Sequence, residues 1–513
     1  MAFKRSWVRI PLSPLSKTCF LLETVFLFFR QSLLFLVDFL WVMRYNVTMG
    51  EEKIYQKGVT TNAMEKIISF FRHLSTTQII LLEYCGVIFL GTLLLCLPIS
   101  IQQETGNTLL NAFFTATSAT CVTGLVLVDT CTHWTTFGQV VILCLIQIGG
   151  IGFMTFCILI LSVTGRKIGL FSRSLMQNSI SAPQLGGIVR MTRFIFLASL
   201  LVEAIGALFL AFFFCPRYGV GKGIWFSVFH SISAFCNAGF DLMGESGAFS
   251  SFIHYTGNWY LNLVIMALIV LGGLGFFVWR DILDNKMKPL KMHLHTKLVL
   301  FVTALLIFGG AFFFFLLEQN SVVFSRLPLD EQILSSLFQS VTVRTAGFNT
   351  LPLNELTESS KFLSICLMLI GGSTGSTAGG IKTTTFAILV LSIFSIFFHR
   401  KQIEVFGRRM EEGIVRSASC IFMLYLFLSC TAAMIIARIE HLPFLDTLFE
   451  CVSAIATVGL TTGITPTLMP FSSLLLAFLM IFGRVGSLTM LLAFSSSKPP
   501  SSSSLPLEKV QIG

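Results

Sequence analysis

Four short segments of this 513-residue chain repeat one pattern. In each, a stretch with an aromatic residue and a Ser or Thr leads to a glycine followed by Leu or Phe; the segments are 114–125, 229–240, 338–348 and 449–460. Their glycines, at positions 124, 239, 347 and 459, are 115, 108 and 112 residues apart. Self-similarity at a near-constant spacing indicates a repeated structural unit. The pattern therefore predicts one unit copied four times.

The composition places these units in a membrane. Hydrophobic residues make up 54% of the chain and charged residues 12%, whereas soluble domains carry about 25% charge. The net charge of +10 could indicate nucleic-acid binding, but the basic residues fall in loops that flank apolar segments. We therefore expect lipid contact and no nucleic-acid partner.

Eight apolar segments are long enough to span a bilayer, which takes about 20 residues as a helix. They are 78–98, 137–163, 188–215, 257–279, 294–317, 361–398, 414–437 and 470–494. Between the two spans of each unit, a shorter semi-apolar stretch ends at the repeated glycine, which suits a re-entrant pore helix. The predicted fold is an all-α membrane protein with four fused span–pore helix–span repeats, eight transmembrane helices and four re-entrant pore loops around one central pore.

The repeats divide most of the chain. They are expected at 75–163, 164–279, 280–398 and 399–494, preceded by an N-terminal extension at 1–70 and followed by a Ser/Pro-rich tail at 495–513. The apolar stretch 19–43 of the extension contains Glu23, Arg30 and Asp38, so it is closer to an interfacial helix than to a clean span. A translation start at Met49 or Met64 is an open alternative.

Basic residues predict the orientation. The linkers 164–193, 280–297 and 399–416 hold five Lys or Arg each, while the opposite loops hold five in total. Because positive charge favours the cytoplasmic side, we expect the linkers and both termini in the cytoplasm. The chain is then a multi-pass protein of the inner cell membrane, with its repeated glycines facing outside.

The repeated glycines suggest a selectivity filter. Such a filter aims backbone carbonyls at an axis, which calls for dihedrals that only glycine adopts without steric cost. The triplets that end in these glycines resemble degenerate forms of the potassium-channel signature T-V-G-Y-G, and the fourth matches T-V-G. The predicted filter, with potassium as its ion, comprises Val122, Thr123, Gly124, Asn237, Ala238, Gly239, Thr345, Ala346, Gly347, Thr457, Val458 and Gly459.

Each second span carries a further glycine mark, at 149–152, 272–275, 371–375 and 483–486. No strand precedes these marks, which argues against a dinucleotide loop. Close packing through small residues suits units one and two, whereas units three and four break the symmetry.

Unit three is expected to form a gate. Its glycine-rich stretch is unlikely to stay helical, and non-helical backbone at membrane depth requires protein or water around it. The predicted gate consists of Gly371, Gly372, Ser373, Thr374, Gly375, Ser376, Thr377, Ala378, Gly379 and Gly380, with Lys382 at the cytoplasmic end and Arg484 from unit four.

Arg484 stands where the other units have a second glycine, near the middle of the predicted span. A charge there costs about 2.5 to 3.5 kcal/mol, so we expect a partner or water. One interpretation has it donate to loop carbonyls or to Ser373 and Ser376 as an electrostatic barrier to cations; the other is a structural tie to backbone carbonyls.

Over residues 75–513 the chain resembles the Trk/Ktr/HKT superfamily of potassium transporters, and within it the KtrB-type translocating subunits. The resemblance rests on the motifs at 116–125, 343–350, 371–383 and 483–489. It implies potassium uptake, often stimulated by sodium, by a homodimer on a cytosolic ring of nucleotide-binding regulatory subunits of the KtrA/TrkA type. The chain departs from the family pattern at Thr374 and Ser487, where proline is more common.

Several alternative functions fit parts of the sequence pattern. A voltage-gated channel would need an Arg-rich sensor helix, and a secondary transporter would show two repeats rather than four. A sodium-transporting subunit, or one associated with a V-type sodium ATPase, stays open, as does the choice between potassium and sodium. No paired carboxylates or nucleophile indicate an enzyme or an organic cofactor; Glu203 and Glu450 are interpreted as acceptors for local backbone groups.

Overall fold

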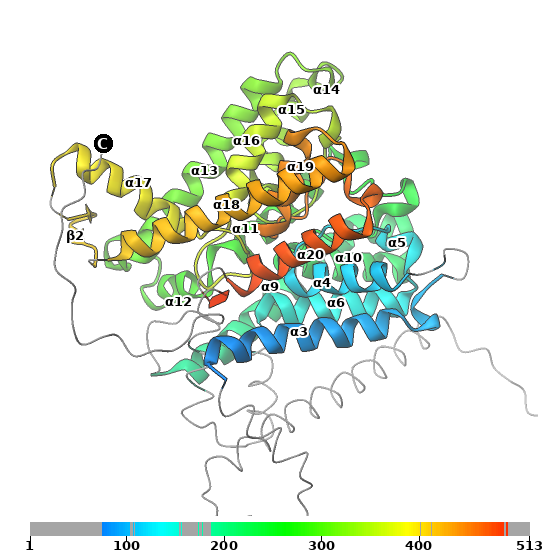
Figure 1. Ribbon diagram of the computed structural model, residues 1–513, viewed down its shortest axis with the longest axis horizontal. Coiled ribbons are helices and arrows are strands. Elements are labelled where there is room, and N and C mark those ends of the chain that lie inside the picture. Colours follow the sequence, from blue (N-terminus) through cyan, green and yellow to red (C-terminus); the bar gives the residue numbers. More distant parts are fainter. Residues whose placement is uncertain are drawn as a thin grey trace, which may run out of the picture.

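The computed structural model describes residues 74–490 except 103–105, 107, 153–154, 156–172, 174–176, 178–185, 401, 412 and 487–488. The predicted extension 1–70, the tail 495–513, most of the linker 164–185 and Ser487 lie outside the described residues. The described part is mostly helical (Figure 1).

Each predicted unit begins with a long helix. Four described helices are long and apolar enough to cross a membrane: α3 (Thr76–Leu95), α9 (Ile188–Tyr218), α13 (Leu294–Glu318) and α18 (Ile414–Glu440). Each overlaps the first predicted span of its unit. Ser75 caps the amino end of α3 in a capping box: its side chain accepts from Gln78 N–H, and the Gln78 side chain accepts from Ser75 N–H.

A shorter helix follows each of these and ends just before a filter triplet. They are α4 (Leu109–Cys121), α10 (Val220–Phe235), α15 (Leu329–Thr342) and α19 (Phe444–Ile455). Thr108 caps α4 through the Asn111 N–H, and acidic residues occupy the first turns of α15 and α19, where they favour the positive end of the helix dipole. With 12 to 16 residues each, these helices are too short to span, as expected for pore helices.

The second spans are short or broken. They are α6 (Thr136–Ile151), α11 (Trp259–Leu274) with α12 (Phe276–Asp284), α16 (Glu358–Leu369) with α17 (Thr383–Phe397), and α20 (Pro470–Val485). The α11–α12 pair bends by 89°. The number of complete membrane crossings therefore stays a prediction, since α6, α17 and α20 have fewer than 18 residues.

The glycine marks have two roles rather than the one expected. At the first glycine of a mark the helix packs on a pore-helix carbonyl: a Cβ at Gly149, Gly272 or Gly483 would overlap the oxygen of Thr120, Phe235 or Ile455 respectively. At the last glycine the helix stops, because Gly152, Gly275 and Gly486 take φ values of 91°, 93° and 95°. Close packing alone was thus an incomplete interpretation for units one and two, which break as unit four does.

The units close into a ring. Helix α6 of the first unit packs on α10 of the second, α11 of the second on α15 of the third, and α16 of the third on α19 of the fourth. The ring closes where α20, late in the sequence, lies beside α4, near its start (Figure 1). This arrangement brings the four filter segments against one another.

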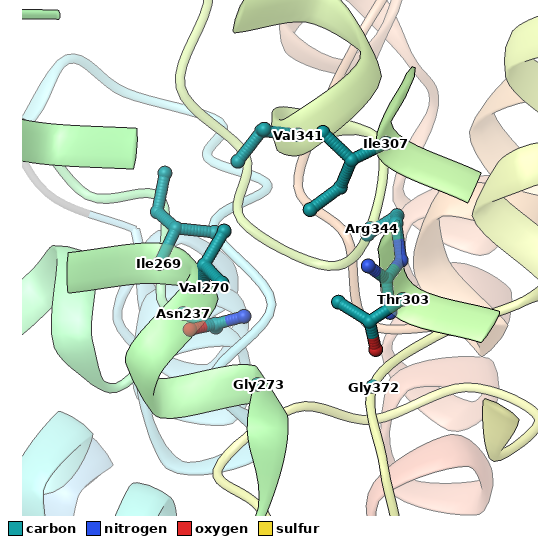
Figure 2. Close-up of a pocket in the computed structure, with 9 residues that line it drawn as sticks. All are labelled: Asn237, Ile269, Val270, Gly273, Thr303, Ile307, Val341, Arg344 and Gly372. Carbon is teal, nitrogen blue, oxygen red and sulfur yellow. The ribbon is translucent and has the colours of Figure 1, made fainter. Parts of the chain in front are cut away.

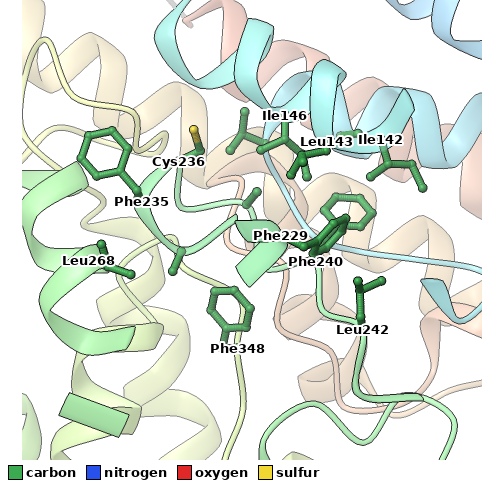
Figure 3. Packing of buried hydrophobic residues seen from close by; sticks show 14 of the residues in the cluster. Ile142, Leu143, Ile146, Phe229, Phe235, Cys236, Phe240, Leu242, Leu268 and Phe348 are labelled. Atoms are coloured by element: carbon green, nitrogen blue, oxygen red, sulfur yellow. The ribbon is translucent and has the colours of Figure 1, made fainter. Parts of the chain in front are cut away.

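Aromatic side chains fill the space between units. Figure 3 shows Phe229 and Phe240 of the second unit below Ile142 and Ile146 of α6, with Phe348 of the third unit close by. All four pore-helix phenylalanines of the repeated pattern are fully buried, each 0% exposed: Phe114, Phe229, Phe338 and Phe449. The repeat's aromatic position is therefore a core position.

One element was not expected from an all-α fold. The linker between units three and four folds into a hairpin of β1 (Glu404–Val405) and β2 (Arg408–Arg409), with Glu404 opposite Arg409. Phe406 and Gly407 turn the chain with φ values of 51° and 72°, as a tight two-residue hairpin loop requires.

Candidate ion pathway

The filter triplets begin in the left-handed region as well as ending there. The first residues, Val122, Asn237, Thr345 and Thr457, have φ values of 57°, 59°, 66° and 53°. This conformation is uncommon for β-branched residues, so surrounding contacts must hold it. Sequence reasoning assigned positive φ to the glycines alone and missed these positions; only Asn237 is of a type that tolerates them readily.

The four glycines meet in one closed ring. A Cβ built on Gly124 would lie 2.5 Å from the Ala238 carbonyl oxygen, one on Gly239 2.9 Å from that of Ala346, and one on Gly347 2.6 Å from that of Val458. Gly459 in turn lies against Thr123 of the first unit, where a Cβ would overlap the Thr123 carbonyl oxygen, so the ring is closed. Each glycine thus faces the residue before the next unit's glycine, and all twelve predicted filter residues are brought together.

Glycine is required in this ring for two reasons. The four residues have φ values between 69° and 97°, which side chains rarely adopt. No space is left for a side chain either, since the Cβ of Gly347 would also approach Gly239 Cα to 2.9 Å. The arrangement can therefore present backbone oxygens, rather than side chains, to a dehydrated cation.

The repeated Ser or Thr holds each filter segment from behind. Ser118 and Ser453 accept from the N–H of Gly124 and Gly459 at 3.0 and 3.1 Å. In the other two units the hydroxyl donates to the residue after the glycine, Ser233 to the Phe240 carbonyl and Thr342 to the Phe348 carbonyl. These side chains are 0% exposed. Position four after the pore-helix phenylalanine is therefore the anchor of the filter.

The electrostatics favour a cation at this point. All four pore helices end immediately before the filter, so the negative ends of their dipoles converge there. Just beyond Gly239, Asp241 accepts from Met243 N–H at 2.9 Å, and the buried Asp129 accepts from Phe249 N–H at 3.1 Å. Asp129 and Asp241 thus lie in the chain that follows the first and second filter segments and accept from local backbone N–H groups.

The predicted gate residues form a non-helical loop between α16 and α17. Its ends are held together, since Gly371 N–H donates to the Ile381 carbonyl at 2.9 Å and Ile381 N–H to the Leu369 carbonyl at 3.1 Å. Its middle is bound to the second unit: Ser373 N–H donates to Gly273, and Phe276 N–H donates to Gly375. These bonds bridge the break between α11 and α12.

The loop also touches the ends of two pore helices. Thr377 Oγ1 donates to the Phe235 carbonyl, the last residue of α10, at 3.1 Å. A Cβ at Gly379 would overlap Thr457 Oγ1 and lie 3.1 Å from the Ala456 carbonyl oxygen. The loop therefore lies directly behind the filter segments of units two and four.

Arg484 is the second to last residue of α20, so the helix of the predicted span 470–494 ends directly after it. Its guanidinium donates to the Thr377 carbonyl at 2.5 Å, and to the carbonyls of Gly149 and Gly150 in the first unit. Backbone carbonyl partners were expected by both interpretations, the structural tie and the barrier, whereas the alternative hydroxyl partners Ser373 and Ser376 do not bond to Arg484. Ser373 bonds with Thr383 instead, and Ser376 donates to the Ser373 carbonyl.

Lys382 is the second basic residue that binds the loop. It lies where the loop enters α17, and its Nζ donates to the Ala378 carbonyl at 2.7 Å. Two cations, Lys382 and Arg484, thus bind carbonyls of the same loop. Such an arrangement can hold the loop in place and raise the potential along the path of a cation.

Glu450 and Glu203 differ in their hydrogen-bond partners. Glu450 accepts from Thr462 N–H at 3.0 Å and from the hydroxyls of Thr461 and Thr465, so it binds the chain that follows the fourth filter segment. Glu203 instead accepts from the Gln147 side chain at 3.0 Å. A backbone partner was the wrong expectation for the Glu203 carboxylate.

Comparison with known proteins agrees with this architecture. The family model TrkH, a cation transport protein, matches residues 53–505. The potassium/sodium uptake protein NtpJ of Enterococcus hirae is 38% identical over 449 residues, covering 86% of this chain and 98% of that protein. The Ktr system potassium uptake protein B of Bacillus subtilis is 38% identical over 435 residues, covering 85% and 96%.

A solved structure supports the fold. The potassium transporter TrkH from Vibrio parahaemolyticus superposes with a TM-score of 0.63 over 82% of this chain and 86% of that one, at 18% sequence identity. With a family model that spans most of the sequence and relatives matched over nearly their whole length, the chain belongs to the TrkH family of cation transport proteins.

Proposed function

We propose that this protein takes up potassium across the cell membrane through the ring of four filter segments. The observation that carries the proposal is the closed cycle in which each filter glycine faces the carbonyl before the next one. Backbone oxygens around one axis replace the hydration shell of potassium. The names of the relatives, which include potassium uptake in both cases, support the same ion.

Sodium has two roles to be tested. In our proposal sodium stimulates potassium uptake. In the alternative, a sodium-transporting subunit, sodium is itself the transported ion; the name of the Enterococcus relative, a potassium/sodium uptake protein, favours this alternative. Purified protein in liposomes, with potassium or sodium outside, separates the two. We expect saturable potassium entry that external sodium increases. Saturable sodium entry with no potassium entry would favour the alternative.

We also propose that the loop from Gly371 to Gly380 is the gate and that Arg484 holds it closed. The support is geometric: Arg484 joins the loop, through the Thr377 carbonyl, to the first unit, through Gly149 and Gly150. Opening would break these bonds and move the loop from behind the filter.

Arg484→Gln tests the role of the charge. Gln retains a donor but is shorter and neutral, so it weakens both the tie and the barrier. We expect potassium uptake about threefold to tenfold faster, corresponding to about 0.7 to 1.4 kcal/mol, the net contribution of one ordinary hydrogen bond, because Gln retains a donor. Uptake by the variant in proteoliposomes is compared with that of Arg438→Gln, which changes an exposed arginine in the last turn of α18. Equal rates for the two correctly inserted variants would contradict the barrier.

The surroundings of the protein follow from the same proposal. We place it in the inner cell membrane with both termini in the cytoplasm, as a homodimer in contact with a nucleotide-binding regulatory ring. The term Ktr system in the names of relatives supports a multi-component system. The β1–β2 hairpin offers an exposed basic surface for such a partner, since Arg408 and Arg409 are both exposed.

Charge reversal tests this docking site. Arg408→Glu with Arg409→Glu replaces attraction by repulsion towards an acidic partner surface, so we expect weaker co-purification of the ring, with the largest difference at low salt. Arg326→Glu, an exposed arginine in a loop predicted to face outside, is the matched control. Salt-independent recovery of the ring at the parent level would exclude the hairpin as the dock.

A further inference from the structure

Arg344 is a buried cation next to the filter that the predicted machinery does not use. It lies one residue before the third filter triplet and is 7% exposed. Its backbone N–H donates to Val341 at 3.2 Å, which places it at the carboxyl end of pore helix α15. Among the described residues it forms no ion pair with a carboxylate. The helix dipole is therefore part of what stabilises its charge.

The hydrogen bonds of this guanidinium are incomplete. Its Nη2 reaches the carbonyl of Gly371, the first residue of the proposed gate, at a long 3.5 Å. Its Nε has no partner among the described groups. A buried donor left unpaired costs free energy, so Nε indicates a missing acceptor.

A small cavity lies beside this group. It has a volume of about 10 Å³, and its lining includes Asn237, Gly273, Thr303, Arg344 and Gly372. Figure 2 shows Arg344 and Thr303 on one side of it and Asn237 on the other, with Gly273 and Gly372 below. The hydroxyl of Thr303, which is 7% exposed, is also unpartnered within the described structure.

Asn237 supplies the opposite wall. With its amide nitrogen turned towards the carbonyls of Ala234, Phe235 and Ile269, it donates to them at 3.2 to 3.3 Å. Its oxygen then lies on the side of Thr345, whose hydroxyl is 3.5 Å from that position. In this orientation the side-chain oxygen of Asn237, in the second filter segment, faces the hydroxyl of Thr345 in the third.

We propose that the cavity binds one water molecule between Arg344 Nε, the Thr303 hydroxyl and the Asn237 amide, and that this bound water couples the filter to the gate. The volume corresponds to about one water, and a buried water typically needs two to four polar partners. A metal cation is disfavoured by the guanidinium, and a chloride ion is too large for the space. The water would join filter segments two and three to Gly371 and Gly372 of the loop.

The consequence is that Arg344 is a positioning residue for ion selection. It does not contact the ion in this arrangement; it fixes the backbone that does. Loss of the water would loosen Asn237 and Thr345, which both hold left-handed conformations, and would weaken the link to Gly371. The inference rests on the proposed filter and gate.

Thr303→Val tests the water without removing the charge. Valine keeps the shape and lacks the hydroxyl, so we expect the KM for potassium to rise about threefold to tenfold, the effect of one hydrogen bond, with a smaller change in maximal rate. Arg344→Lys should give the same change, because lysine lacks the planar fork of donors. Thr192→Val is the matched control, since the buried Thr192 hydroxyl donates only within its own helix, to Ile188 at 2.9 Å.

Two measurements together test whether a water bound at Arg344 couples the filter to the gate. A high-resolution structure of the full-length protein should show one water within hydrogen-bond distance of Arg344 Nε, absent in Thr303→Val. An empty cavity, or a potassium KM in Thr303→Val equal to that of Thr192→Val, would overturn the inference while leaving the proposed function intact. Absence of potassium uptake by the parent protein would instead overturn the proposed function.

Discussion

Gly347→Ser is expected to weaken the apparent affinity for potassium by about tenfold or more. Gly347 has a φ of 82°, and a Cβ there would lie 2.6 Å from the Val458 carbonyl oxygen and 2.9 Å from Gly239 Cα. The side chain therefore pushes apart two neighbouring filter segments and distorts the ring of oxygens. A distortion worth about 1.4 kcal/mol already corresponds to a factor of ten. Concentration dependence of potassium uptake measures the effect.

Gly309→Ser is the matched control for this prediction. Gly309 lies on α13 of the same unit, and a Cβ there would meet nothing within 4 Å. Its uptake should therefore follow the parent curve. If Gly347→Ser is inserted at the parent level and also follows the parent curve, the third filter segment does not line the ion path.

Deleting residues 375–378 is expected to raise potassium uptake and to reduce its dependence on the regulatory partner. The deletion removes five hydrogen bonds that hold the loop: Phe276 N–H to Gly375, Thr377 N–H to Gly272, the Thr377 hydroxyl to Phe235, Arg484 to Thr377 and Lys382 to Ala378. At about 1 kcal/mol for each bond, the closed loop loses about 5 kcal/mol. This shifts its equilibrium with an open form by more than about a thousandfold, although conduction through the filter limits the gain in flux.

Thr377→Val provides a graded comparison. It removes only the hydroxyl bond to the Phe235 carbonyl and should give a smaller increase in the same direction. Uptake is measured with and without the partner for both variants. Full control of the shortened protein by its partner would show that the gate lies elsewhere.

The four segments that meet in the glycine ring could be predicted from the sequence because their constraint is local and repeated, while their binding of an ion stays a prediction. Only glycine meets both the positive φ and the close approach seen at Gly124 and Gly459, so the same residue recurs in all four copies. The buried aromatic and the Ser or Thr anchor recur for the same reason. Since one unit cannot surround a pore by itself, four copies in one chain predicted a ring of four units around one pore.

Other features depend on contacts between units, which no single repeat encodes. The left-handed φ of Val122 is maintained by the tertiary structure against its own preference. The partners of Arg484 lie more than 100 residues away in two different units, so the spacing of residues in the sequence could not predict which groups it binds. The cavity at Arg344 likewise requires Thr303 and Asn237 to come from separate units. Sequence reasoning indicated which residues are unusual, but not what they touch.

The position of the transported ion tests the central claim most directly. Rubidium scatters X-rays anomalously and substitutes for potassium, so crystals of the protein grown in rubidium reveal its binding sites. We predict an anomalous peak on the axis of the ring, among the carbonyl oxygens of Thr123, Ala238, Ala346 and Val458. A protein that transports rubidium in liposomes but shows its anomalous peaks only away from these four segments would contradict the account.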